Sequence, residues 1–388
     1  GHDFRPDYLY IGEARRVLGD PPVLGLTATA PPRVRRDIVQ HLSPDGEMRV
    51  IAGDVTRPNL QLEVFRAANL DEKLRRLLAF CQAEDGSGII YAGTRRRCER
   101  ITAMLRRHGV QATTYHAGIP NRDEVQDAFM TGQTRIVVAT IAFGLGIDKP
   151  DIRFIVHFVP ANSLEAYYQE AGRAGRDGQP ARCLLMLTPS DQGTLTRRLH
   201  QDQMGVDYLR ALYGAVSKFL GGDSVGNVAL EDLERETRSD EVPVRVGLSI
   251  LEETALIRQG PDVPRACLLK LRARVDPDRT PELAAFSAAA RLQPDQWLNV
   301  KLVDVGRRAG LDAHAIEGRV LDWARDGYLH YRFSGRDRLL ARLDPPDDAS
   351  ARIALWLERY ATIQTQRIDE IVSYAKTRHC RHGHLNTY

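Results

Sequence analysis

The chain has 388 residues, which is too long for one compact core, so two or three domains are expected. Its 43% hydrophobic and 27% charged residues are typical of a soluble globular protein, and the absence of any run of about 18 apolar residues excludes a helical membrane span. The net charge of +3 is too small to indicate nucleic-acid binding by itself, so any basic surface must be local.

Short β-branched apolar runs alternate with amphipathic stretches from residue 1 to about residue 180. This alternation predicts an α/β fold with a parallel sheet and crossover helices. Ligands of such sheets bind at the carboxyl ends of the strands, where Thr27, Thr94, His116 and Thr140 are expected. The predicted strands are 21–30, 86–94, 111–118, 134–144, 152–159 and 181–189, and the predicted helices are 71–84, 95–109 and 121–132.

The pattern changes after about residue 205. Three predicted helices, 206–222, 228–237 and 242–257, are followed by a basic strand-like run at 265–275, and the same order returns with predicted helices at 297–310 and 312–329 and a basic hairpin. That order is the outline of a winged helix, so the sequence predicts two in tandem, with modules for protein interaction as the alternative. The second wing, 330–343, is predicted to be a hairpin that turns at Ser334 and Gly335. Its predicted phosphate-facing residues are Arg332, Arg336, Arg338 and Arg342, although a solvated hairpin would have the same composition.

The stretch QEAGRAGRDG, residues 169–178, holds Arg173 and Arg176 between glycines. Arginines three residues apart lie on one helix face, and a guanidinium donates two parallel hydrogen bonds to a phosphate. The glycines let the backbone approach a bulky ligand. We therefore predict a phosphate site here, and a basic loop that caps a helix is the alternative.

Four of the five cysteines lie in apolar or helical patterns and are predicted to be reduced core residues: Cys81, Cys98, Cys183 and Cys267. Cys380 differs because it lies in KTRHCRHGH, which is too polar for a core and indicates a metal or redox role.

Together, the motifs of the first half resemble those of the RecQ family of superfamily 2 DNA helicases. GHDFRP resembles the end of the family's aromatic-rich loop, LGLTATA its motif III, and SGIIYAGTRRRCE and TYHAGI its motif IV and the motif that follows. VVATIAFGLGIDKPDIRFIVH resembles motif V, and SLEAYYQEAGRAGRDG motif VI. The resemblance implies these domains: the end of a first RecA-like lobe (1–60), a complete second lobe (61–205), two winged helices (206–282 and 283–348), and a helix that leads into a zinc segment (349–388).

The resemblance also implies a role for the arginine pair, which would act on ATP held by the preceding lobe. An arginine supplied from another domain is worth about 10³–10⁵ in the rate of phosphoryl transfer. We expect Arg176 to be this arginine, Arg173 to support it, and Gln169 to link nucleotide binding to domain closure. Asp148, after Gly146 in the predicted ATP site, is placed to contact the ribose, and a helix N-cap is its alternative role.

Further residues are expected to contact DNA. Thr27 and Thr29 resemble the motif III residues whose hydroxyls connect the nucleotide site to the DNA-binding surface in the family. The alternative for each is a buried threonine with local hydrogen bonds. Phe4 and Arg5 resemble the aromatic-rich loop. The residues expected to grip backbone phosphates are Thr94, Arg95, His116, Arg122 and Thr140.

The sequence contains neither GxxxxGK[ST] nor a DEAH-type box for Mg²⁺, which the family carries upstream. We expect this segment not to hydrolyse ATP unaided. The zinc segment is also displaced, because both predicted winged helices precede Cys380. Cys380 is expected to be a first zinc ligand whose partners follow Tyr388, since His379, His382 and His384 lie too close for ordinary spacing.

The sequence therefore predicts a monomeric ATP-dependent DNA helicase with 3′–5′ polarity that acts in DNA repair and recombination. Its expected partners are single-stranded and forked or duplex DNA, its cofactors ATP, Mg²⁺ and Zn²⁺, and its location the cytoplasm or nucleus. An RNA helicase or annealing factor is one alternative, and a non-catalytic DNA-binding scaffold with a RecA-like fold is another.

Overall fold

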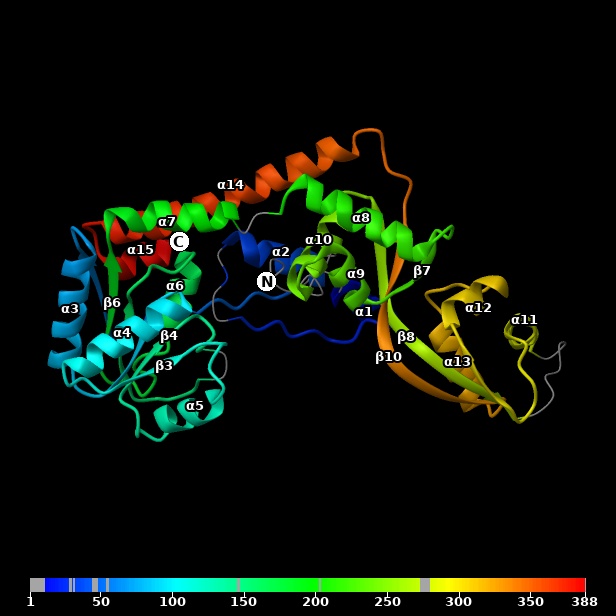
Figure 1. Cartoon of the computed structure of the whole chain (residues 1–388), viewed down its shortest axis with the longest axis horizontal. Coiled ribbons are helices and arrows are strands. Elements are labelled where there is room, and N and C mark those ends of the chain that lie inside the picture. The colour runs from blue at the N-terminus through cyan, green and yellow to red at the C-terminus, as the bar shows by residue number, and fades with distance from the viewer. Residues whose placement is uncertain are drawn as a thin grey trace. The chain divides into compact units, whose positions relative to one another are not determined.

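The computed structural model describes residues 11–27, 30, 32–43, 48–53, 56–144, 147–201, 204–272 and 280–387. They form two compact units: residues 11–203 with 361–388, and residues 204–360. The helix α14 (Ala349–Lys376) contributes to both units (Figure 1). None of the described helices combines the length and the apolar character that a membrane span needs.

The first unit is built on a six-stranded parallel sheet in the order β1-β6-β5-β2-β4-β3. Its central strands are short apolar runs that are buried on both faces, as crossover helices on both sides of a parallel sheet require. The predicted parallel sheet is therefore confirmed. The strands are β1 (Leu60–Arg66), β2 (Ser87–Tyr91), β3 (Ala112–Tyr115), β4 (Ile136–Ala139), β5 (Ile152–His157) and β6 (Ala181–Leu187).

Helices cover both faces of this sheet, and each face has its own hydrophobic core. One core receives Leu77 and Phe80 from α3 (Leu70–Ala83) and Leu105 from α4 (Arg95–Arg107). The other core is covered by α5 (Arg122–Met130), α6 (Leu164–Ala171), α7 (Pro189–Gln201), the second half of α14 and α15 (Arg381–Thr387). Side-chain caps start three of these helices, from Asn69, Thr94 and Ser163.

Before the sheet, α1 (Ile11–Val17) and α2 (Pro32–Leu42) are joined by a hydrogen bond of 2.6 Å from Arg15 to the carbonyl oxygen of Leu42. The predicted strand at 21–30 is wrong for the residues described there, which adopt no regular structure. Leu24 and Leu26 are 82% and 85% exposed, and no described strand pairs with this segment. An apolar run becomes a strand only when a neighbouring strand supplies its hydrogen bonds.

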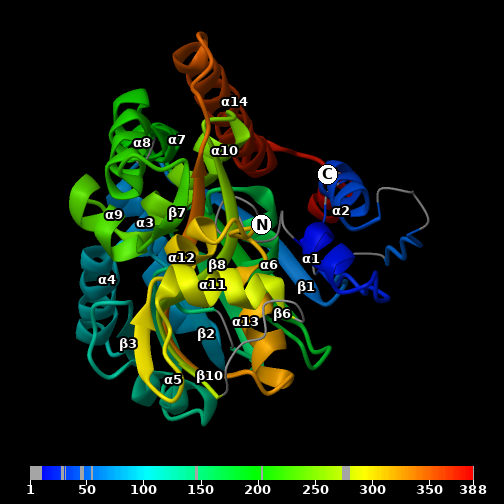
Figure 2. The same ribbon diagram turned by 90° about the vertical axis from the view of Figure 1, so that its right-hand side faces the viewer.

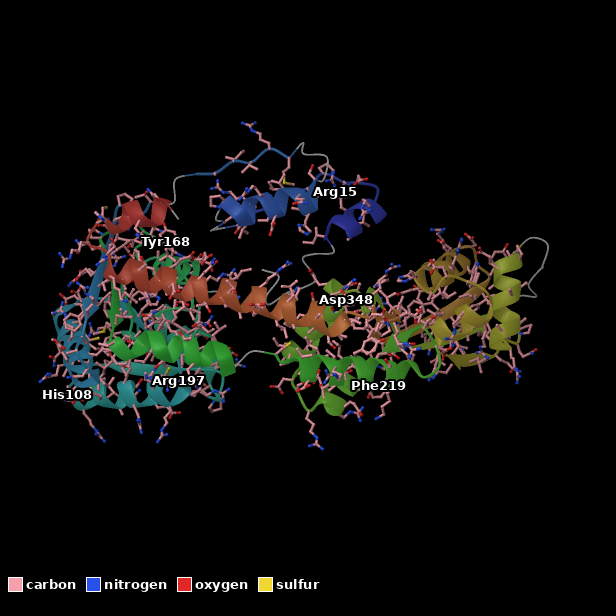
Figure 3. All side chains as sticks on the ribbon, turned by 90° about the horizontal axis from the view of Figure 1, so that it is seen from above. Arg15, His108, Tyr168, Arg197, Phe219 and Asp348 are labelled. Atoms are coloured by element: carbon pink, nitrogen blue, oxygen red, sulfur yellow. The ribbon has the colours of Figure 1, made fainter. Side chains whose placement is uncertain are left out.

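The second unit repeats one order of elements twice: helix, strand, two helices, long strand. The first copy is α8 (Val206–Leu220), β7 (Val225–Val228), α9 (Leu230–Thr237), α10 (Glu241–Glu253) and β8 (Ile257–Leu271). The second copy is α11 (Pro281–Ala290), β9 (Trp297–Val300), α12 (Leu302–Arg308), α13 (Ile316–Arg325) and β10 (Leu329–Arg342). Apart from Phe219, which is 39% exposed near the end of α8 (Figure 3), the large apolar side chains of α8 are mostly buried in the first copy's core.

The two copies exchange their long strands. The antiparallel sheet has the order β7-β10-β8-β9, and β8 and β10 pair along almost their whole lengths. The second half of β10 lies beside β7, while the second half of β8 lies beside β9. Helices α11, α12 and α13 gather at one end of this ribbon (Figure 1), the end that faces the viewer in Figure 2. Among the described residues, neither 206–282 nor 283–348 therefore has a sheet of its own.

Two local predictions in this unit are wrong. The stretch from His330 to Leu343 is no hairpin, because Leu329–Arg342 is one continuous strand whose partner is β8. Gly335 does have a left-handed φ of 65°, but it lies inside the strand, opposite Arg265, and the pairing with β8 keeps its register from Ser334 to Arg336. The predicted helix at 297–310 is divided into β9 and α12.

Candidate nucleotide and DNA site

The loop after α6 carries the arginine pair and is fixed by a close approach to the loop after β4. The guanidinium of Arg173 donates to the carbonyl oxygen of Gly144. A Cβ at Gly144 would lie 2.9 Å from Nη2 of Arg173, so a side chain there would displace the guanidinium. The glycine thus allows the contact between the predicted motifs V and VI.

Arg176 and Asp148, two predicted ATP contacts, form an ion pair. Arg176 also donates to the carbonyl oxygen of Ile147 at 3.3 Å. Asp148 is 83% exposed and Arg176 36%, so the pair lies at the surface of the first unit. The structure thus brings these two residues together. It does not place Asp148 at a helix N-cap, because residues 147–149 lead into a turn.

Sequence reasoning missed two residues that hold this loop, Arg57 and Asn59. Arg57 donates to the carbonyl oxygens of Gly175 at 2.7 Å and Ala174 at 3.2 Å. Asn59 donates to Gly175 at 2.8 Å and to Gln179 at 2.9 Å. Gly175 has a φ of 56°, and a Cβ there would lie 2.5 Å from Nδ2 of Asn59. The only signal in the sequence was a polar TRPN segment directly before a strand.

A buried polar cluster beneath α6 was missed as well. His157, fully buried at the end of β5, has its Nε2 2.7 Å from Oε2 of Glu170. Its ring lies between those of Tyr91, 5.3 Å away, and Tyr167, 4.8 Å away, measured between centroids. Burial, with the Glu170 carboxylate adding to it, raises the pKa of Tyr91. The phenol therefore stays protonated and donates to the carbonyl oxygen of Phe143 at 3.1 Å, which ties the end of β2 to motif V.

Gln169 is exposed on α6, one residue before Glu170. Gln169, Arg173 and Arg176 therefore belong to one continuous segment of the chain, which ends in the loop held by Arg57. Gly146, Phe4, Arg5 and Thr29 lie outside the described residues.

Three of the predicted DNA-contacting residues do follow neighbouring strands. Thr94, Thr140 and His116 come after β2, β4 and β3, which are adjacent in the sheet. The Thr94 hydroxyl caps α4 by accepting from the backbone of Arg97 at 3.3 Å. The half-buried Thr140 donates through its backbone to Tyr115 at 3.2 Å.

His116 is only 4% exposed. Its Nδ1 accepts from the backbone of Gly118 at 3.1 Å, so a neutral ring carries its proton on Nε2. That nitrogen lies 3.3 Å from Oε1 of Glu99 but is not aligned for a hydrogen bond. The His116 side chain is therefore buried and does not face solvent. By contrast, the side chains of Arg95 and Arg122, at the starts of α4 and α5, are exposed. Thr27 is exposed and follows no described strand.

Comparison with known proteins matches the same segment. The family model "Helicase conserved C-terminal domain" matches residues 69–178. The "ATP-dependent DNA helicase RecQ" of Pasteurella multocida is 43% identical over 202 residues, which is 51% of this chain and 31% of that protein. The "Probable ATP-dependent DNA helicase RecS" of Bacillus subtilis is 40% identical over 194 residues, 49% of this chain and 39% of that protein. Over this half, the chain is similar to helicases of the RecQ family.

The matched segment thus spans about a third of the length of these RecQ relatives. Among solved structures, the C-terminal domain of the DEAD-box protein Dbp5 is 19% identical with a TM-score of 0.32, and covers 37% of this chain and 85% of that one. Dbp5 from S. cerevisiae bound to RNA and ADP BeF3 is 19% identical with a TM-score of 0.40, and the match covers 49% of this chain and 51% of that one.

The four arginines predicted in the second wing differ in their surroundings. Arg336 pairs with Glu317 at 2.6 Å, and Arg338, 13% exposed, pairs with Asp262 at 3.1 Å. The guanidinium of Arg332 lies 4.9 Å from the ring centroid of Trp297. Within the part of the chain that the structure describes, Arg332 and Arg342 have no carboxylate partner. Two of the four charges are therefore already compensated.

Cys380 is exposed before α15, but the residues around it do not fit a zinc site. His382 contacts the carbonyl oxygen of Leu60 through Nε2 at 3.0 Å, and the ring of His384 packs edge-on against Tyr374. No group of three or more His, Cys, Asp or Glu side chains among the described residues could hold a metal ion. The other four cysteines are buried, as predicted.

Proposed function

We propose that the complete protein is an ATP-dependent DNA helicase of the RecQ type, in which the first unit supplies the second RecA-like lobe. The observation that carries the proposal is the loop with Arg173 and Arg176, held by Arg57 and Asn59 beside Gly144 and Asp148. A scaffold without catalysis has no use for two arginines fixed in one loop, of which Arg176 is exposed and Arg173 half-buried.

In this proposal Arg176 leaves Asp148 to contact the transferring phosphoryl group of ATP bound to the preceding lobe. An exposed ion pair contributes only about 0–1 kcal/mol, so this exchange costs little. Arg173 holds the Gly144 carbonyl and keeps motif V against motif VI, while Asp148, once released, is free to accept from the ribose hydroxyls. Gln169, on the same segment, links nucleotide binding to closure of the two lobes.

The proposed partner is DNA, single-stranded, forked or duplex, gripped along its phosphates by Thr94, Arg95, Arg122 and Thr140 and by the exposed wing arginines. The family resemblance supplies the 3′–5′ polarity, the need for Mg²⁺, the role in repair and recombination, the monomeric state and the cytoplasmic or nuclear location. Zinc binding through Cys380 would need ligands other than the described residues.

The test is Arg176→Ala in the complete protein. We expect DNA-stimulated ATP hydrolysis to fall by about 10³-fold or more while nucleotide binding persists, because the charge acts on the transition state. Hydrolysis within threefold of the parent would overturn the assignment. Unwinding of an RNA duplex but not of a DNA duplex would instead support the RNA helicase alternative.

A further inference from the structure

One face of the sheet in the second unit carries an exposed aromatic and basic cluster. In the register of the sheet, Trp297 on β9 is opposite Lys270 on β8, which is opposite His330 on β10. Arg332 lies two residues beyond His330, and Leu268 is its partner on β8. Because side chains alternate along a strand, these five residues share one face, which we call the outer face.

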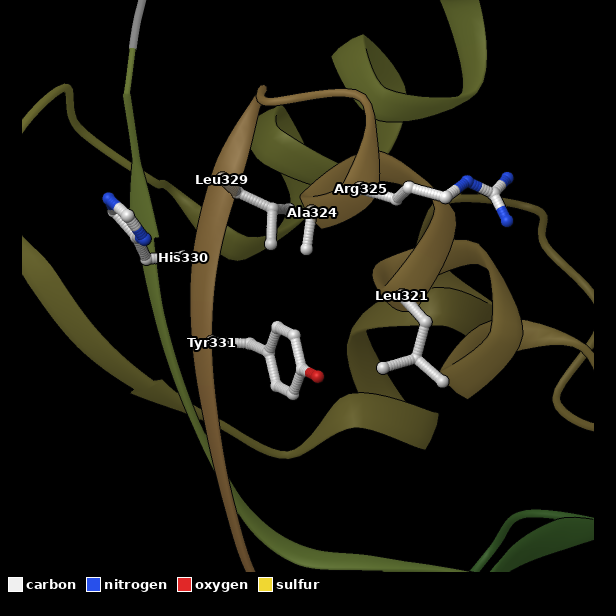
Figure 4. Close-up of a pocket in the computed structure, with 6 residues that line it drawn as sticks. All are labelled: Leu321, Ala324, Arg325, Leu329, His330 and Tyr331. Atoms are coloured by element: carbon white, nitrogen blue, oxygen red, sulfur yellow. The ribbon is translucent and has the colours of Figure 1, made fainter.

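The other side of the same strands is the core. Leu269 and Leu329 are buried there with α11, α12 and α13. Figure 4 shows the alternation on β10: Leu329 and Tyr331 point toward Leu321 and Arg325 of α13, whereas His330 points away from them. The outer face is therefore the side of this end of the sheet that α13 does not cover.

Large side chains remain exposed on the outer face. Trp297 is 42% exposed and Leu268 is 37% exposed, and the side chains of His330 and Arg332 are exposed as well. A tryptophan is usually largely buried, so an exposed one on the face of a sheet indicates a binding surface. The rings of Trp297 and His330 lie 6.4 Å apart with an angle of 33° between their planes, so they form adjacent platforms.

The charge of this face suits a polyanion. The guanidinium of Arg332 lies over the Trp297 ring, and in the described part of the chain no carboxylate pairs with it. Lys270 adds a second cation, partly compensated by Asp295 at 3.2 Å. Aromatic rings beside cations are the combination by which proteins bind single strands, since rings stack on unpaired bases and cations contact phosphates. The bases of a duplex are stacked on one another, so they are not free to stack on these rings.

We propose that the outer face binds single-stranded DNA, with a base stacked on Trp297 or His330 and the adjoining phosphate held by Arg332. The proposal rests on the proposed function only for the identity of its ligand as DNA. It adds a second strand-binding site to the phosphate grip predicted on the first unit.

The site is tested directly by photocrosslinking. The complete protein, without ATP, is mixed with an oligothymidine that contains 5-iodo-deoxyuridine, irradiated, and digested for mass spectrometry. We expect crosslinks in the peptides that contain Trp297 and His330. Crosslinks confined to residues 11–203 would overturn the proposal. An Arg176→Ala variant should crosslink as the parent does, so this result is independent of the ATPase test.

Variants then separate stacking from other roles. Trp297→Ala should weaken binding of the oligonucleotide about 10-fold and Trp297→Phe should restore most of it, because stacking needs only an aromatic ring. Arg332→Ala should flatten the slope of log affinity against log salt by about 0.7, the value for one phosphate contact on a single strand. The matched control is Tyr331→Ala, since Tyr331 is adjacent, 40% exposed, and on the other face.

Three results would contradict the proposal. Trp297→Ala could bind as the parent does, Tyr331→Ala could lose as much affinity as Trp297→Ala, or Trp297→Ala could weaken a blunt duplex and a single strand equally. A change in oligomeric state with DNA binding intact would mark the outer face as a protein interface instead. Trp297 is exposed, so each variant should retain the parent's thermal unfolding midpoint, which serves as the check on folding.

Discussion

Arg57 donates a hydrogen bond of 2.7 Å to the carbonyl oxygen of Gly175, the residue between Ala174 and Arg176. The same oxygen accepts from Asn59 at 2.8 Å. Two side chains from the segment before β1 thus fix the backbone from which the predicted catalytic arginine extends. Since a misplacement of about 1 Å can cost 10²-fold in rate, this contact has a catalytic consequence.

We expect Arg57→Ala in the complete protein to lower the kcat of DNA-stimulated ATP hydrolysis by about 10- to 100-fold, with little change in the KM for ATP. Arg57 acts through the loop and not on the nucleotide, so binding should persist. Steady-state kinetics measure both values. Arg57→Lys should recover part of the loss, since an ammonium reaches fewer of these carbonyls.

Arg135 offers the matched control. It donates at 2.6 Å to the carbonyl oxygens of Glu84 and Cys81, so it has the same chemistry at a distance from motif VI. Arg135→Ala should lower the thermal stability about as much as Arg57→Ala but leave kcat nearly unchanged. Equal losses of kcat in both variants would show that Arg57 serves only the fold.

The sequence predicted the parallel sheet because burial on both faces produces uninterrupted β-branched runs, as in IVVA at 136–139. Arg57 could not be assigned in this way, because its partners are backbone carbonyls more than 110 residues away, which no side-chain pattern encodes. The exchange of β8 and β10 was missed for a similar reason. A strand's pattern shows which face is buried but not which strand lies beside it.

Asp148 is predicted to contact the ribose, and its exposed ion pair with Arg176 makes two outcomes separable. Asp148→Asn should raise the KM for ATP about 10-fold, as the loss of hydrogen bonds to a charged group does. It should leave the KM for 2′,3′-dideoxy-ATP unchanged, because that nucleotide lacks the hydroxyls. If the two nucleotides are affected equally, Asp148 acts through Arg176. The free energy of unfolding should change by less than about 1 kcal/mol.

The cysteines should differ sharply in reactivity. Burial raises the pKa of Cys81, Cys98, Cys183 and Cys267 to about 12, so at pH 8 almost none of each thiol is the reactive thiolate. Of the five, Cys380 alone is exposed. A thiol reagent at pH 8 should therefore modify Cys380 rapidly in the native state and all five cysteines in denaturant, as counted by mass spectrometry.

Raising the pH from 7 to 9 should leave the four buried cysteines slow to react, since their thiolates form only near pH 12 in the folded state. The same experiment addresses zinc. If the complete protein holds zinc through Cys380, the thiol should be protected until a chelator is added. Rapid modification with or without chelator would remove Cys380 from the proposed metal ligands.

The wing arginines should contribute unequally to binding of a forked duplex. Arg332 has no carboxylate partner among the described residues, whereas Arg336 donates to Glu317 at 2.6 Å. Replacing Arg332 with Ala should flatten the slope of log affinity against log salt by about 0.7, because its proposed phosphate contact is to the single-stranded arm of the fork. Arg336→Ala should flatten it less, because Glu317 already compensates that charge.

Glu317→Gln removes the compensating carboxylate without shortening the side chain, so it should free Arg336 to contact a phosphate and steepen the slope of log affinity against log salt. Titrations at several salt concentrations give all three values. Equal slopes for the parent and the three variants would show that this ribbon meets no DNA backbone and would favour its alternative role in protein interaction.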